Sequence, residues 1–519
     1  MRYLTDLKEA REKVDGIAAN AYARIKESPV LLFLIFLNLC ITIPLCATLN
    51  VIIDEAYSLD TTGKDIGYAL HQALNYELQP PLYFILLNLW RNLNHSIFFA
   101  RLFSIICMTI TIYCVSKLAQ KLLNKIYPNW LVVAVFAFNP FTIWAALEIR
   151  LYAFLILLSA LLWLAFYDGY FASTPKIRPR LLYIFLSIAA LYTQYFSGFF
   201  LVANGAVLLF LRRWQDLRNY LANMAVVGFC FIPMLGVIPH QFSDHTSSIK
   251  QYSSLVDSLR GLFRRLGYYG LPISWLPPAF REHWLLYVII TSVLLMIVIK
   301  YRASISQTHV FIWVSTFVVF TLFVIVRMRL SQELIEPRHT AILFLPSIFS
   351  IAAVMSLIEE KHRRKITIAW AITLILLGTG SLYSSYKPLA KYGDYIRVAE
   401  YIMSEEKPNQ PIVIFNAEAK IALRNYYAGK NPLVAIPKDE DFKSYDPQNF
   451  VFRDEKDLFS SLAVIPNDFT KIWVVNNYLC KFLDVDYGCD LFEESLQKYY
   501  SVETRREFYG AEVRLMRRK

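Results

Sequence analysis

The sequence predicts a mainly α-helical, polytopic membrane protein with about 11 transmembrane helices, amphipathic surface helices in its first outer loop and a small C-terminal extracytoplasmic α/β domain. Hydrophobic residues make up 56% of the chain, and only 18% of its residues are charged. The apolar residues also gather in long runs, such as 30–49 and 366–383. A soluble protein carries about 25% charged residues, whereas a run of roughly 20 apolar residues crosses the hydrocarbon core as a helix.

The loops between the apolar runs predict which side of the membrane each part faces. Basic residues gather in the N-terminal segment and in every second loop. Basic loops face the cytoplasm, so the N-terminus is expected inside and the C-terminus, after an odd number of spans, outside. The first 30 residues lack the pattern of a cleaved signal peptide, which makes the first span an uncleaved anchor. The expected spans are 30–49, 97–116, 130–146, 151–167, 181–194, 196–211, 220–238, 284–300, 309–326, 339–357 and 366–383.

The formal net charge of +12 does not indicate nucleic-acid binding. The lysines and arginines are spread over short loops between hydrophobic runs instead of forming one basic face. Their distribution fits the sidedness of a membrane protein, so no nucleic-acid partner is expected.

Two outer segments and a soluble tail accompany the apolar runs. The first outer loop holds the stretch 64–76 and the half-hydrophobic PPLYFILLNLW, which we expect to be helices lying at the membrane surface. The second outer segment, 239–283, has no strong period. From residue 384 the composition turns soluble, with β-branched runs at PIVIFN and KIWVVN that predict strands and a helical pattern at 418–427. We therefore expect a membrane domain, 1–383, and an outer α/β domain, 384–519.

Two of the seven cysteines, Cys480 and Cys489, lie in the polar tail. The other five lie inside apolar runs, where a thiol acts as a small hydrophobic group. Cys480 and Cys489 pair if the tail faces an oxidising compartment, and the sequence leaves a disulfide and two free thiols equally open.

An acidic pair follows the first span directly, in the motif DEAYSLD. Asp54 and Glu55 are adjacent at the expected outer surface. Neighbouring carboxylates repel, so one of them can be a stronger base than an isolated acid, as the deprotonation of a hydroxyl nucleophile requires. Two other interpretations stay open, namely oxygen ligands for a divalent cation and a solvated pair of loop acids.

A second charged group lies in the motif NPFTIWAALEIRLYAF. Glu148 and Arg150 stand between two apolar runs, with Trp144 and Tyr152 beside them. Almost no loop separates these runs, so both charges are expected at the edge of the bilayer, where charges are costly and mark function by default. The alternative is an interfacial ion pair with aromatic anchors.

Arginines on the outer side break the charge rule. Arg327, Arg329 and Arg338 crowd a short outer loop that ends in EPRHTAILFLP. An anionic lipid headgroup explains them, because arginine binds phosphate with two parallel hydrogen bonds, and Arg101 at the outer start of the second span is placed to join them. The alternative is pairing with the two glutamates of the same loop.

Carboxylates, arginines and aromatic side chains at one face suit a sugar attached to a phosphate. A glycosyl–phosphate bond already contains a good leaving group. A protein that acts on it has to supply a base for the acceptor and positive charge for the departing phosphate. Asp54 and Arg338 fit these two roles.

The order of the motifs resembles the GT-C superfamily, specifically the bacterial relatives of the dolichyl-phosphate-mannose protein mannosyltransferases (glycosyltransferase family 39) and of the lipid A aminoarabinose transferases. The Asp–Glu pair follows the first span, PPLYF comes later in the same loop, and ARLFS opens the second span. NPFTIWAALEIRLYAF contains the pattern Glu-x-Arg-x-Tyr, and LYTQYF and PRHTAILFLP have counterparts as well. The resemblance covers roughly residues 30–360.

The resemblance implies a role for each candidate residue. Asp54 is the catalytic base, and Glu55 is its partner. Two departures bear on the donor, because relatives commonly carry His or Lys at Gln79 and often His at Gln194. No cofactor and no metal are expected, with a divalent cation at the acidic pair as the reservation. The implied site for the donor and its lipid phosphate comprises Tyr57, Gln79, Tyr83, Arg101, Glu148, Arg150, Tyr152, Arg338 and His339.

The activity that the resemblance implies is transfer of a sugar from a polyprenyl phosphate to an acceptor hydroxyl at the extracytoplasmic face, with inversion. The expected location is a membrane, the bacterial inner membrane first. The expected partners are the polyprenyl-phosphate sugar, membrane lipids and an acceptor that the sequence does not identify.

Two other classes of protein compete with this interpretation. A transporter or flippase of lipid-linked sugars would use the same arginines, but transporters usually show repeated halves, and this sequence has no repeat. A non-catalytic membrane scaffold would leave the acidic pair unexplained.

Overall fold

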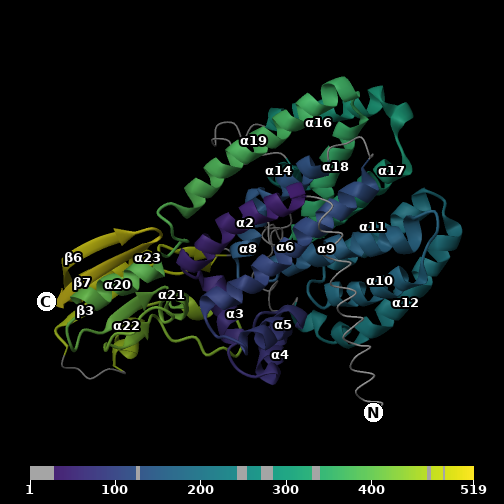
Figure 1. Cartoon of the computed structure of the whole chain (residues 1–519). Coiled ribbons are helices and arrows are strands. Elements are labelled where there is room, and N and C mark those ends of the chain that lie inside the picture. Colours follow the sequence, from purple (N-terminus) through teal and green to yellow (C-terminus); the bar gives the residue numbers. More distant parts are fainter. Residues whose placement is uncertain are drawn as a thin grey trace, which may run out of the picture.

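The computed structural model describes residues 29–123, 129–241, 254–270, 284–329, 339–463, 469–482 and 485–519. Its helices form an elongated bundle, and a mixed β-sheet with its own helices lies at one end of that bundle (Figure 1). The predictions for the N-terminal segment and for Arg338 and its loop fall outside the described residues.

Within the described ranges, five helices are long and apolar enough to cross a membrane, or six if a bent pair is one span. Five further helices occupy the remaining expected spans. The predicted class, a mainly helical integral membrane protein, is confirmed, while the number of 11 crossings stays a prediction. The five long helices are α2 (Pro29–Thr48), α6 (Ile97–Leu122), α9 (Tyr152–Phe166) with the π-helical turn η1 (Tyr167–Phe171), α17 (Gln307–Arg329) and α19 (Glu360–Tyr386). The further five are α10 (Ile177–Leu191), α11 (Ser197–Phe210), α12 (Trp214–Leu235), α16 (Trp284–Lys300) and α18 (Phe344–Leu357), with the short turns η3 (Arg302–Ser304) and η5 (Ala341–Leu343) between them.

The expected span 130–146 is the bent pair, α7 (Asn129–Ala137) and α8 (Pro140–Leu147), with 50° between the two helices. Pro140 causes the break, because proline lacks an amide hydrogen and disfavours helical backbone in the residue before it. Asn139 then caps the new helix, as its side-chain oxygen accepts the Phe141 amide at 2.9 Å. The residue after α8 is Glu148, one of the predicted site residues.

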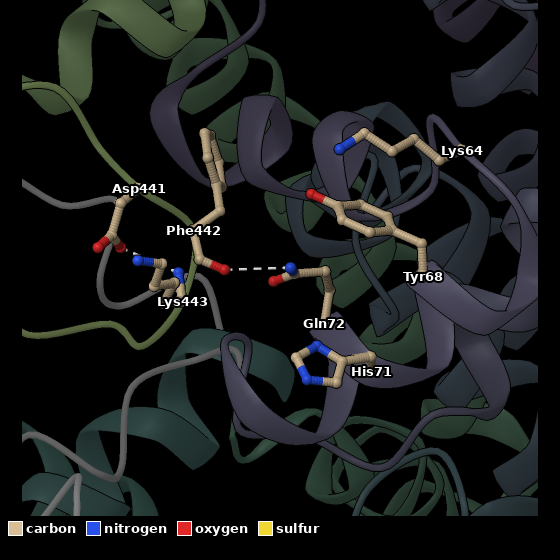
Figure 2. Close-up of a pocket in the computed structure, with 7 residues that line it drawn as sticks. All are labelled: Lys64, Tyr68, His71, Gln72, Asp441, Phe442 and Lys443. Carbon is tan, nitrogen blue, oxygen red and sulfur yellow. Dashed lines mark hydrogen bonds between the residues drawn. The ribbon is translucent and has the colours of Figure 1, made fainter.

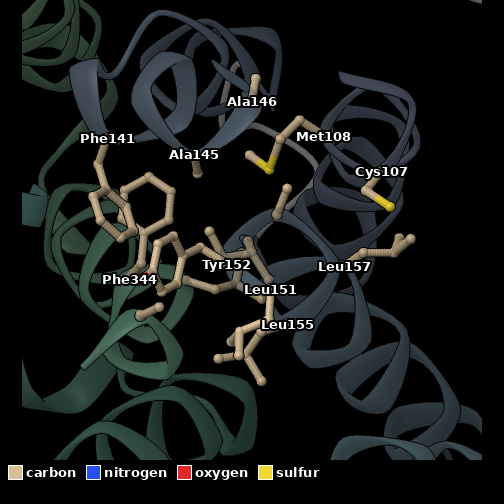
Figure 3. Packing of buried hydrophobic residues seen from close by; sticks show 14 of the residues in the cluster. Cys107, Met108, Phe141, Ala145, Ala146, Leu151, Tyr152, Leu155, Leu157 and Phe344 are labelled. Atoms are coloured by element: carbon tan, nitrogen blue, oxygen red, sulfur yellow. The ribbon is translucent and has the colours of Figure 1, made fainter. Parts of the chain in front are cut away.

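The centre of the bundle is packed with aliphatic and aromatic side chains from several helices (Figure 3). Met108 of α6 and Leu155 of α9 have no exposed surface, and the rings of Phe141 in α8 and Phe344 in α18 lie 4.9 Å apart. Of the five long helices, α9 is the most deeply buried. This dense packing holds the first turns of α6 and α9, which carry predicted site residues, in fixed positions.

The first outer loop folds into three short helices, α3 (Ile53–Thr61), α4 (Ile66–Asn75) and α5 (Leu82–Arg91). The helices predicted at 64–76 and in PPLYFILLNLW are confirmed as α4 and α5, and α3 was not predicted. Arg91 at the end of α5 donates to Thr62 Oγ1 at 2.7 Å, which ties α5 to the end of α3. The place of these helices at the membrane surface stays a prediction.

The second outer segment contains a helix that its sequence pattern did not reveal. α14 (Leu255–Gly270) packs against α17 and α18. The absence of a strong period in 239–283 gave no prediction of this helix. Three arginines interrupt the apolar residues of α14, so its sequence looks polar although the helix is amphipathic.

The C-terminal part holds a five-stranded mixed sheet in the order β2-β1-β3-β7-β6. β1 pairs in parallel with β2 and β3, and β7 pairs antiparallel with β3 and β6. In register, Ile412 lies opposite Trp473, and Ile472 opposite Met516. The strands are β1 (Ile412–Phe415), β2 (Leu433–Ala435), β3 (Lys471–Asn476), β6 (Tyr500–Phe508) and β7 (Ala511–Arg518), with a separate pair β4 (Lys481–Phe482) and β5 (Val485–Asp486). The helices are α20 (Tyr395–Glu405), α21 (Glu418–Leu423), α22 (Glu455–Leu462), α23 (Cys489–Tyr499) and the turn η6 (Pro447–Phe450).

The two strands predicted in the tail are confirmed as β1 and β3, and the helix predicted between them is α21, which ends at Leu423. The hairpin of β6 and β7 was missed. β6 is an edge strand whose residues are mostly exposed and include Glu503, Arg505, Arg506 and Glu507, whereas buried parallel strands appear in a sequence as continuous hydrophobic runs.

The hydrophobic core continues from the helices into one face of the sheet. Ile412, Ile414 and Trp473 belong to the same buried cluster as the membrane helices, whereas Val413 and Val474, on the other face, belong to a second cluster. α19 also runs through residue 384 without a break. The division of the chain into two domains at this point stays a prediction, and the sheet shares a core with the helical part.

Three basic loops meet at the C-terminal end of α6, opposite the sheet. Lys121 Nζ lies 2.6 Å from Asp168 Oδ1, and Arg180 and Arg213 lie 3.3 Å and 2.9 Å from the carboxylate of Asp216. α6 runs from there for 26 residues to its first turn near the sheet, about 39 Å at the helical rise of about 1.5 Å per residue. If basic loops alternate as predicted, these three loops have to lie on the same side of the membrane, as they do here. That this side faces the cytoplasm stays a prediction.

Cys480 and Cys489, the pair that the sequence left open, form a disulfide. The other five cysteines are free thiols. Disulfides persist in oxidising compartments, so this bond fits a tail that lies outside the cytoplasm.

Gly378 of α19 faces the bend between α7 and α8 at close range. A Cβ atom at Gly378 would lie 3.2 Å from Pro140 Cγ, whereas a Cβ atom at Gly380 would meet nothing within 4 Å. We expect Gly378→Leu to destabilise the protein by about 1–3 kcal/mol through overpacking, and Gly380→Leu to leave its stability close to that of the wild type. Thermal unfolding of both variants in the same detergent measures this. Equal melting temperatures would contradict the close contact of α19 with the bend.

Candidate functional site

The first turn of α3 presents its two carboxylates to different surroundings. The Ile52 amide before the helix donates to Glu55 Oε2 at 3.1 Å, so Glu55 satisfies a backbone donor at the helix N-terminus. Glu55 has no exposed surface, whereas Asp54 is partly exposed. The positive end of the helix dipole favours negative charge at both residues.

Glu55 is held by two cations from distant parts of the chain. Arg101 of α6 donates to its two oxygens at 3.2 Å and 3.0 Å, and Lys391 Nζ lies 2.9 Å from Oε1. The Ile149 amide donates to the same Oε1 at 3.0 Å. Burial by itself would raise the pKa of Glu55, but Arg101 and Lys391 lower it to about 2. The expected strengthening of a base by repulsion within the acidic pair therefore does not apply to Glu55.

Arg101, which binds Glu55, has no exposed surface. It also donates to the carbonyl oxygens of Cys46 at 3.3 Å and Asn50 at 2.7 Å, and to that of Leu49. These bonds tie the end of α2 to the turn that carries the acidic pair. Arg101 was predicted to join a lipid-phosphate site; its burial corrects this, because its guanidinium is engaged inside the protein.

Lys391 is a site residue that the sequence analysis missed. It follows α19, its side chain is almost completely buried, and its Nζ lies 2.9 Å from both Glu55 Oε1 and Glu148 Oε1. The ammonium also donates to the Leu147 carbonyl oxygen at 2.9 Å, and the Lys391 amide donates to Asn50 Oδ1 at 2.7 Å. A single lysine in a polar tail carries no local signal, and only the fold brings it back to the acidic pair.

Glu148 and Arg150 are both buried, and each pairs with another element, so the alternative of an ion pair between them is wrong. Burial raises the pKa of Glu148 to about 7, although Lys391 acts against this rise. Arg150 lies 2.8 Å from Glu77 Oε2 and 3.0 Å from Ser58 Oγ. Glu77, just beyond α4, is a second buried acid that the sequence analysis did not single out.

The other predicted site residues of the first two outer loops surround these charges. Tyr83 is almost completely buried, and its hydroxyl has no hydrogen-bond partner in the part of the chain that the structure describes. The same holds for Gln79 Oε1. Tyr152 stacks on Trp144 with their ring centroids 4.9 Å apart. Buried polar atoms without a protein partner are uncommon and mark places for water or a ligand.

The outer arginine loop is described only at its two ends. Arg338 lies outside the described residues, and Arg327 and Arg329 close α17. The guanidinium of Arg327 occupies the space beside Gly261 of α14. The ring centroid of His339 lies 6.2 Å from that of Phe196.

The C-terminal part adds a buried carboxyl group beside α3. Glu418 of α21 accepts the Tyr57 hydroxyl at 2.9 Å and the Asn416 side-chain amide at 3.3 Å. Burial raises the pKa of Glu418 to about 7, and the charges of Asp54 and Glu440 act in the same direction. Tyr57, predicted as a donor-binding residue, is thus buried and connects α3 to the C-terminal part.

These contacts form one charge cluster around the first turn of α3. Asp54 interacts electrostatically with Glu77, Arg150 and Glu418, so it adjoins the cluster. Asp54 is partly exposed, whereas the other acids of the cluster are buried. The arrangement presents an accessible carboxylate on a rigid, charge-compensated support. The buried members are Glu55, Glu77, Glu148, Glu418, Arg101, Arg150 and Lys391.

Among the described residues, no group of three or more His, Cys, Asp or Glu side chains is arranged to hold a metal ion. The reservation about a cation between Asp54 and Glu55 does not fit the geometry, because both oxygens of Glu55 are bonded to Arg101 and one also to Lys391. The expectation that no metal is needed stays a prediction.

A bundle of membrane helices, an acidic turn after the first of them and a mixed sheet packed at the bundle end define the GT-C class of fold. Two solved structures share this fold. The crystal structure of ArnT from Cupriavidus metallidurans in the apo state matches with a TM-score of 0.55 and 13% identity, over 96% of this chain and 98% of that chain. The structure of ArnT bound to undecaprenyl phosphate matches with the same score and identity, over 94% and 96% of the two chains.

No protein-family model and no curated protein sequence matches the chain. At 13% identity the likeness to ArnT establishes the fold alone. The GT-C resemblance that the order of motifs indicated is therefore confirmed at the level of the fold.

Lys391→Met should destabilise the protein, because it leaves the buried Glu55 and Glu148 with Arg101 as their nearest cation. Removing one partner of a buried ion pair costs about 3–5 kcal/mol. Adding Glu148→Gln to Lys391→Met should restore part of this loss. Lys387→Met, on an exposed residue nearby, is the matched control. Thermal unfolding in detergent compares the variants, and a Lys391→Met protein as stable as the control would refute a stabilising role for this ammonium.

Glu418 should make the stability of the protein depend on pH. Its pKa in the folded protein, about 7, lies above the usual 4.5, so the folded state keeps a proton that the unfolded state releases. This stabilisation is fully present below pH 4.5 and is lost as the pH rises through 7, and a shift of this size corresponds to about 3 kcal/mol. Glu148 acts in the same direction, so Glu418→Gln should reduce the pH dependence without abolishing it.

Unfolding curves between pH 4.5 and pH 8 measure this effect. Glu405→Gln, on an exposed residue of α20, is the control and should leave the pH dependence as in the wild type. If the wild type and Glu418→Gln gave parallel curves, the pKa of Glu418 would be the same in the folded and unfolded states, and the prediction would be wrong.

Proposed function

We propose that this protein is a membrane glycosyltransferase that moves a sugar, a hexose or a pentose, from an undecaprenyl or dolichyl phosphate to an acceptor hydroxyl. The transfer takes place at the extracytoplasmic face and inverts the anomeric carbon. The observation that carries the proposal is the first turn of α3, where Asp54 is partly exposed while its neighbour Glu55 is fixed in the charge cluster.

The shared fold supports the class of donor. One of the two ArnT structures holds undecaprenyl phosphate, so in that protein this fold accommodates a polyprenyl phosphate. The apolar helices of the present chain offer the same kind of surroundings for a polyprenyl tail. A donor anchored in the membrane brings its phosphate and sugar to the membrane surface, where the acidic turn is expected.

The proposed chemistry is a single displacement. The Asp54 carboxylate takes the proton of the acceptor hydroxyl, and the acceptor oxygen forms a bond to the anomeric carbon on the face opposite the phosphate. The bond between the anomeric carbon and the phosphate oxygen breaks, and its electron pair leaves with the lipid phosphate. General-base catalysis of this kind contributes about 10²–10⁴-fold.

Arg150 interacts electrostatically with Asp54. Burial disfavours its charge, but Glu77 and Asp54 favour it, so the pKa of Arg150 lies above its usual range. We assign the charge that meets the departing phosphate to Arg338, as the outer arginines of the sequence indicate.

The buried members of the charge cluster are positioning residues in this proposal. Glu55 fixes the turn of α3 through Arg101 and Lys391, and Glu148 shares the Lys391 ammonium. Tyr83 and Gln79 are the donor-binding candidates, because the Tyr83 hydroxyl and Gln79 Oε1 lack a partner in the described chain. A rigid support of this kind places a catalytic group without reorganisation during the reaction.

Two observations support the outer face as the place of transfer. The three basic loops that meet at the far end of α6 fit the cytoplasmic side. The disulfide of Cys480 and Cys489 fits an oxidising compartment for the sheet. The acidic turn lies at the sheet end of the bundle, because Lys391 contacts Glu55 and Glu418 accepts a hydrogen bond from Tyr57.

Asp54→Asn should lower sugar transfer at least about 100-fold while donor binding persists. The assay uses purified protein in lipid nanodiscs, a panel of radiolabelled polyprenyl-phosphate sugars and membrane extracts as acceptors, and follows label that leaves the lipid. Asp65→Asn is the control, because Asp65 only caps α4 and asparagine caps a helix equally well. Donor binding without turnover in both the wild type and Asp54→Asn, with lipid moving between leaflets, would refute the enzyme and favour a transporter.

A further inference from the structure

A cleft of about 590 Å³ opens between α4 and residues 441–443 of the C-terminal part (Figure 2). Ligand pockets in proteins commonly measure about 300–1,000 Å³, so a sugar with a charged substituent fits this space. None of the predicted site residues lines the cleft. Its walls are formed by Lys64, Tyr68, His71 and Gln72 on one side and by Asp441, Phe442 and Lys443 on the other.

The cleft has an excess of positive charge. Lys64 and Lys443 line opposite walls, and neither forms an ion pair with any residue that the structure describes. The Lys64 ammonium lies 3.9 Å from the centroid of the Tyr68 ring. Asp441, the acid of the cleft, already accepts the Lys443 backbone amide at 3.0 Å. Two ammonium groups on opposite sides of one space, without an ion-pair partner among the described residues, favour an anion with several oxygen acceptors.

Gln72 contributes a buried polar atom that has no protein partner. The side chain is almost completely buried, and its amide nitrogen donates to the Phe442 carbonyl oxygen at 3.1 Å (Figure 2). Its Oε1 has no hydrogen-bond partner among the described residues. Leaving such an atom unsatisfied costs about 1–3 kcal/mol, so a donor from a ligand or from water is expected at this wall of the cleft.

Phe442 is held in an unusual backbone conformation. Its φ of +57° lies in the left-handed region, which costs a residue with a Cβ atom roughly 1–2 kcal/mol. The bond from Gln72 and the packing of the Phe442 ring on Tyr76 and Tyr57, with centroids 5.5 Å and 6.3 Å away, keep it there. Strain of this kind is found preferentially at ligand sites.

The same rings connect the cleft to the acidic turn. Tyr57 lies one helical turn after Asp54 in α3 and donates to Glu418 of the C-terminal part. Phe442, Tyr76 and Tyr57 thus form a layer of aromatic side chains between the cleft and the charge cluster. A molecule in the cleft therefore lies close to the proposed catalytic base without occupying its site.

We infer that this cleft is a subsite for an anionic group, a phosphate or a carboxylate, of the acceptor glycoconjugate. Lys64 and Lys443 hold the anion, Gln72 Oε1 accepts a sugar hydroxyl, and the rings of Tyr68 and Phe442 offer apolar faces. The acceptor is the fitting occupant because one wall belongs to the C-terminal part, whose described residues include no helix able to span a membrane, while the donor's polyprenyl tail stays in the bilayer. The assignment to the acceptor rests on the proposed function.

The test measures binding of glucose 6-phosphate and of glucose to the full-length protein in nanodiscs of neutral phosphatidylcholine, by calorimetry. The wild type should bind glucose 6-phosphate, and glucose at least about tenfold more weakly. The double variant Lys64→Met/Lys443→Met should lose this preference for the phosphorylated sugar. Lys430→Met, an exposed lysine outside the cleft, should retain it, and unchanged melting temperatures exclude unfolding as the cause of a loss.

Three further measurements separate the possible occupants. Slow hydrolysis of the lipid donor, with water as the acceptor, should be the same in the wild type and the double variant. If hydrolysis falls with the two lysines, the cleft serves the donor, and the acceptor subsite is overturned. If nanodiscs with phosphatidylglycerol suppress glucose 6-phosphate binding through the same lysines, the cleft is a lipid-headgroup site, which also overturns it.

The failure of the proposed function has a different signature. A wild-type protein that neither transfers nor hydrolyses any donor, yet binds glucose 6-phosphate through Lys64 and Lys443, would refute the enzyme and leave an anion site. Equal binding of glucose and glucose 6-phosphate by the wild type would refute the subsite whatever the enzyme assay gives.

Discussion

One ammonium group, that of Lys391, is shared by two buried carboxylates, and much of the site depends on it. The Lys391 ammonium lies between the carboxylates of Glu55 and Glu148, and Arg101 binds Glu55 as a second cation. Four charges removed from water are stable only while each keeps its partners. The end of α2, the turn of α3, the segment after α8 and the segment after α19 therefore have to meet at one point. The orientation of Asp54 follows from that meeting, because it is the neighbour of Glu55 in the same turn.

This network makes the C-terminal part integral to the site. Lys391 comes from the segment that leads into the sheet, and Glu418 of α21 binds Tyr57 of α3. One face of the sheet also belongs to the same hydrophobic core as the helices. The acidic turn is thus held from the membrane side by Arg101 and from the sheet side by Lys391 and Glu418. The proposed acceptor subsite also lies where the helical part meets the C-terminal part, with one wall from α4 and one from residues 441–443.

Local patterns of the sequence predicted much of the fold. The apolar runs predicted the membrane helices because hydrophobicity over about 20 residues decides insertion without reference to the rest of the chain. The runs PIVIFN and KIWVVN predicted the central strands for a similar reason, since both faces of β1 and β3 are buried. β6 and α14 were not predicted, because charged residues interrupt their apolar pattern. The motifs containing Asp54, Glu148 and Arg150, all expected at the outer surface, lie near one another in the structure.

The partners of these residues could not be predicted. Glu77, Lys391 and Glu418 stand in stretches with no motif, and the contacts that define them join residues far apart in the chain. The sequence also suggested that both acids of the pair lie at the outer surface and that Arg101 faces a lipid. Burial decides both questions, since Glu55 and Arg101 have no exposed surface. Exposure of a single side chain is a property of the whole packing and has no signature in a short motif.

The position of Lys391 in the chain also bears on biogenesis. A ribosome delivers Glu55 and Glu148 to the membrane long before it reaches residue 391, and α19 precedes that residue directly. Arg101 of α6 is available to Glu55 early, but the ammonium that both carboxylates share is made only after α19. Their ion pairs with Lys391 therefore form only when the segment after α19 docks. A nascent chain halted before this segment would leave both carboxylates without the Lys391 ammonium, so the unfinished chain would differ from the finished protein in the net charge buried at this point.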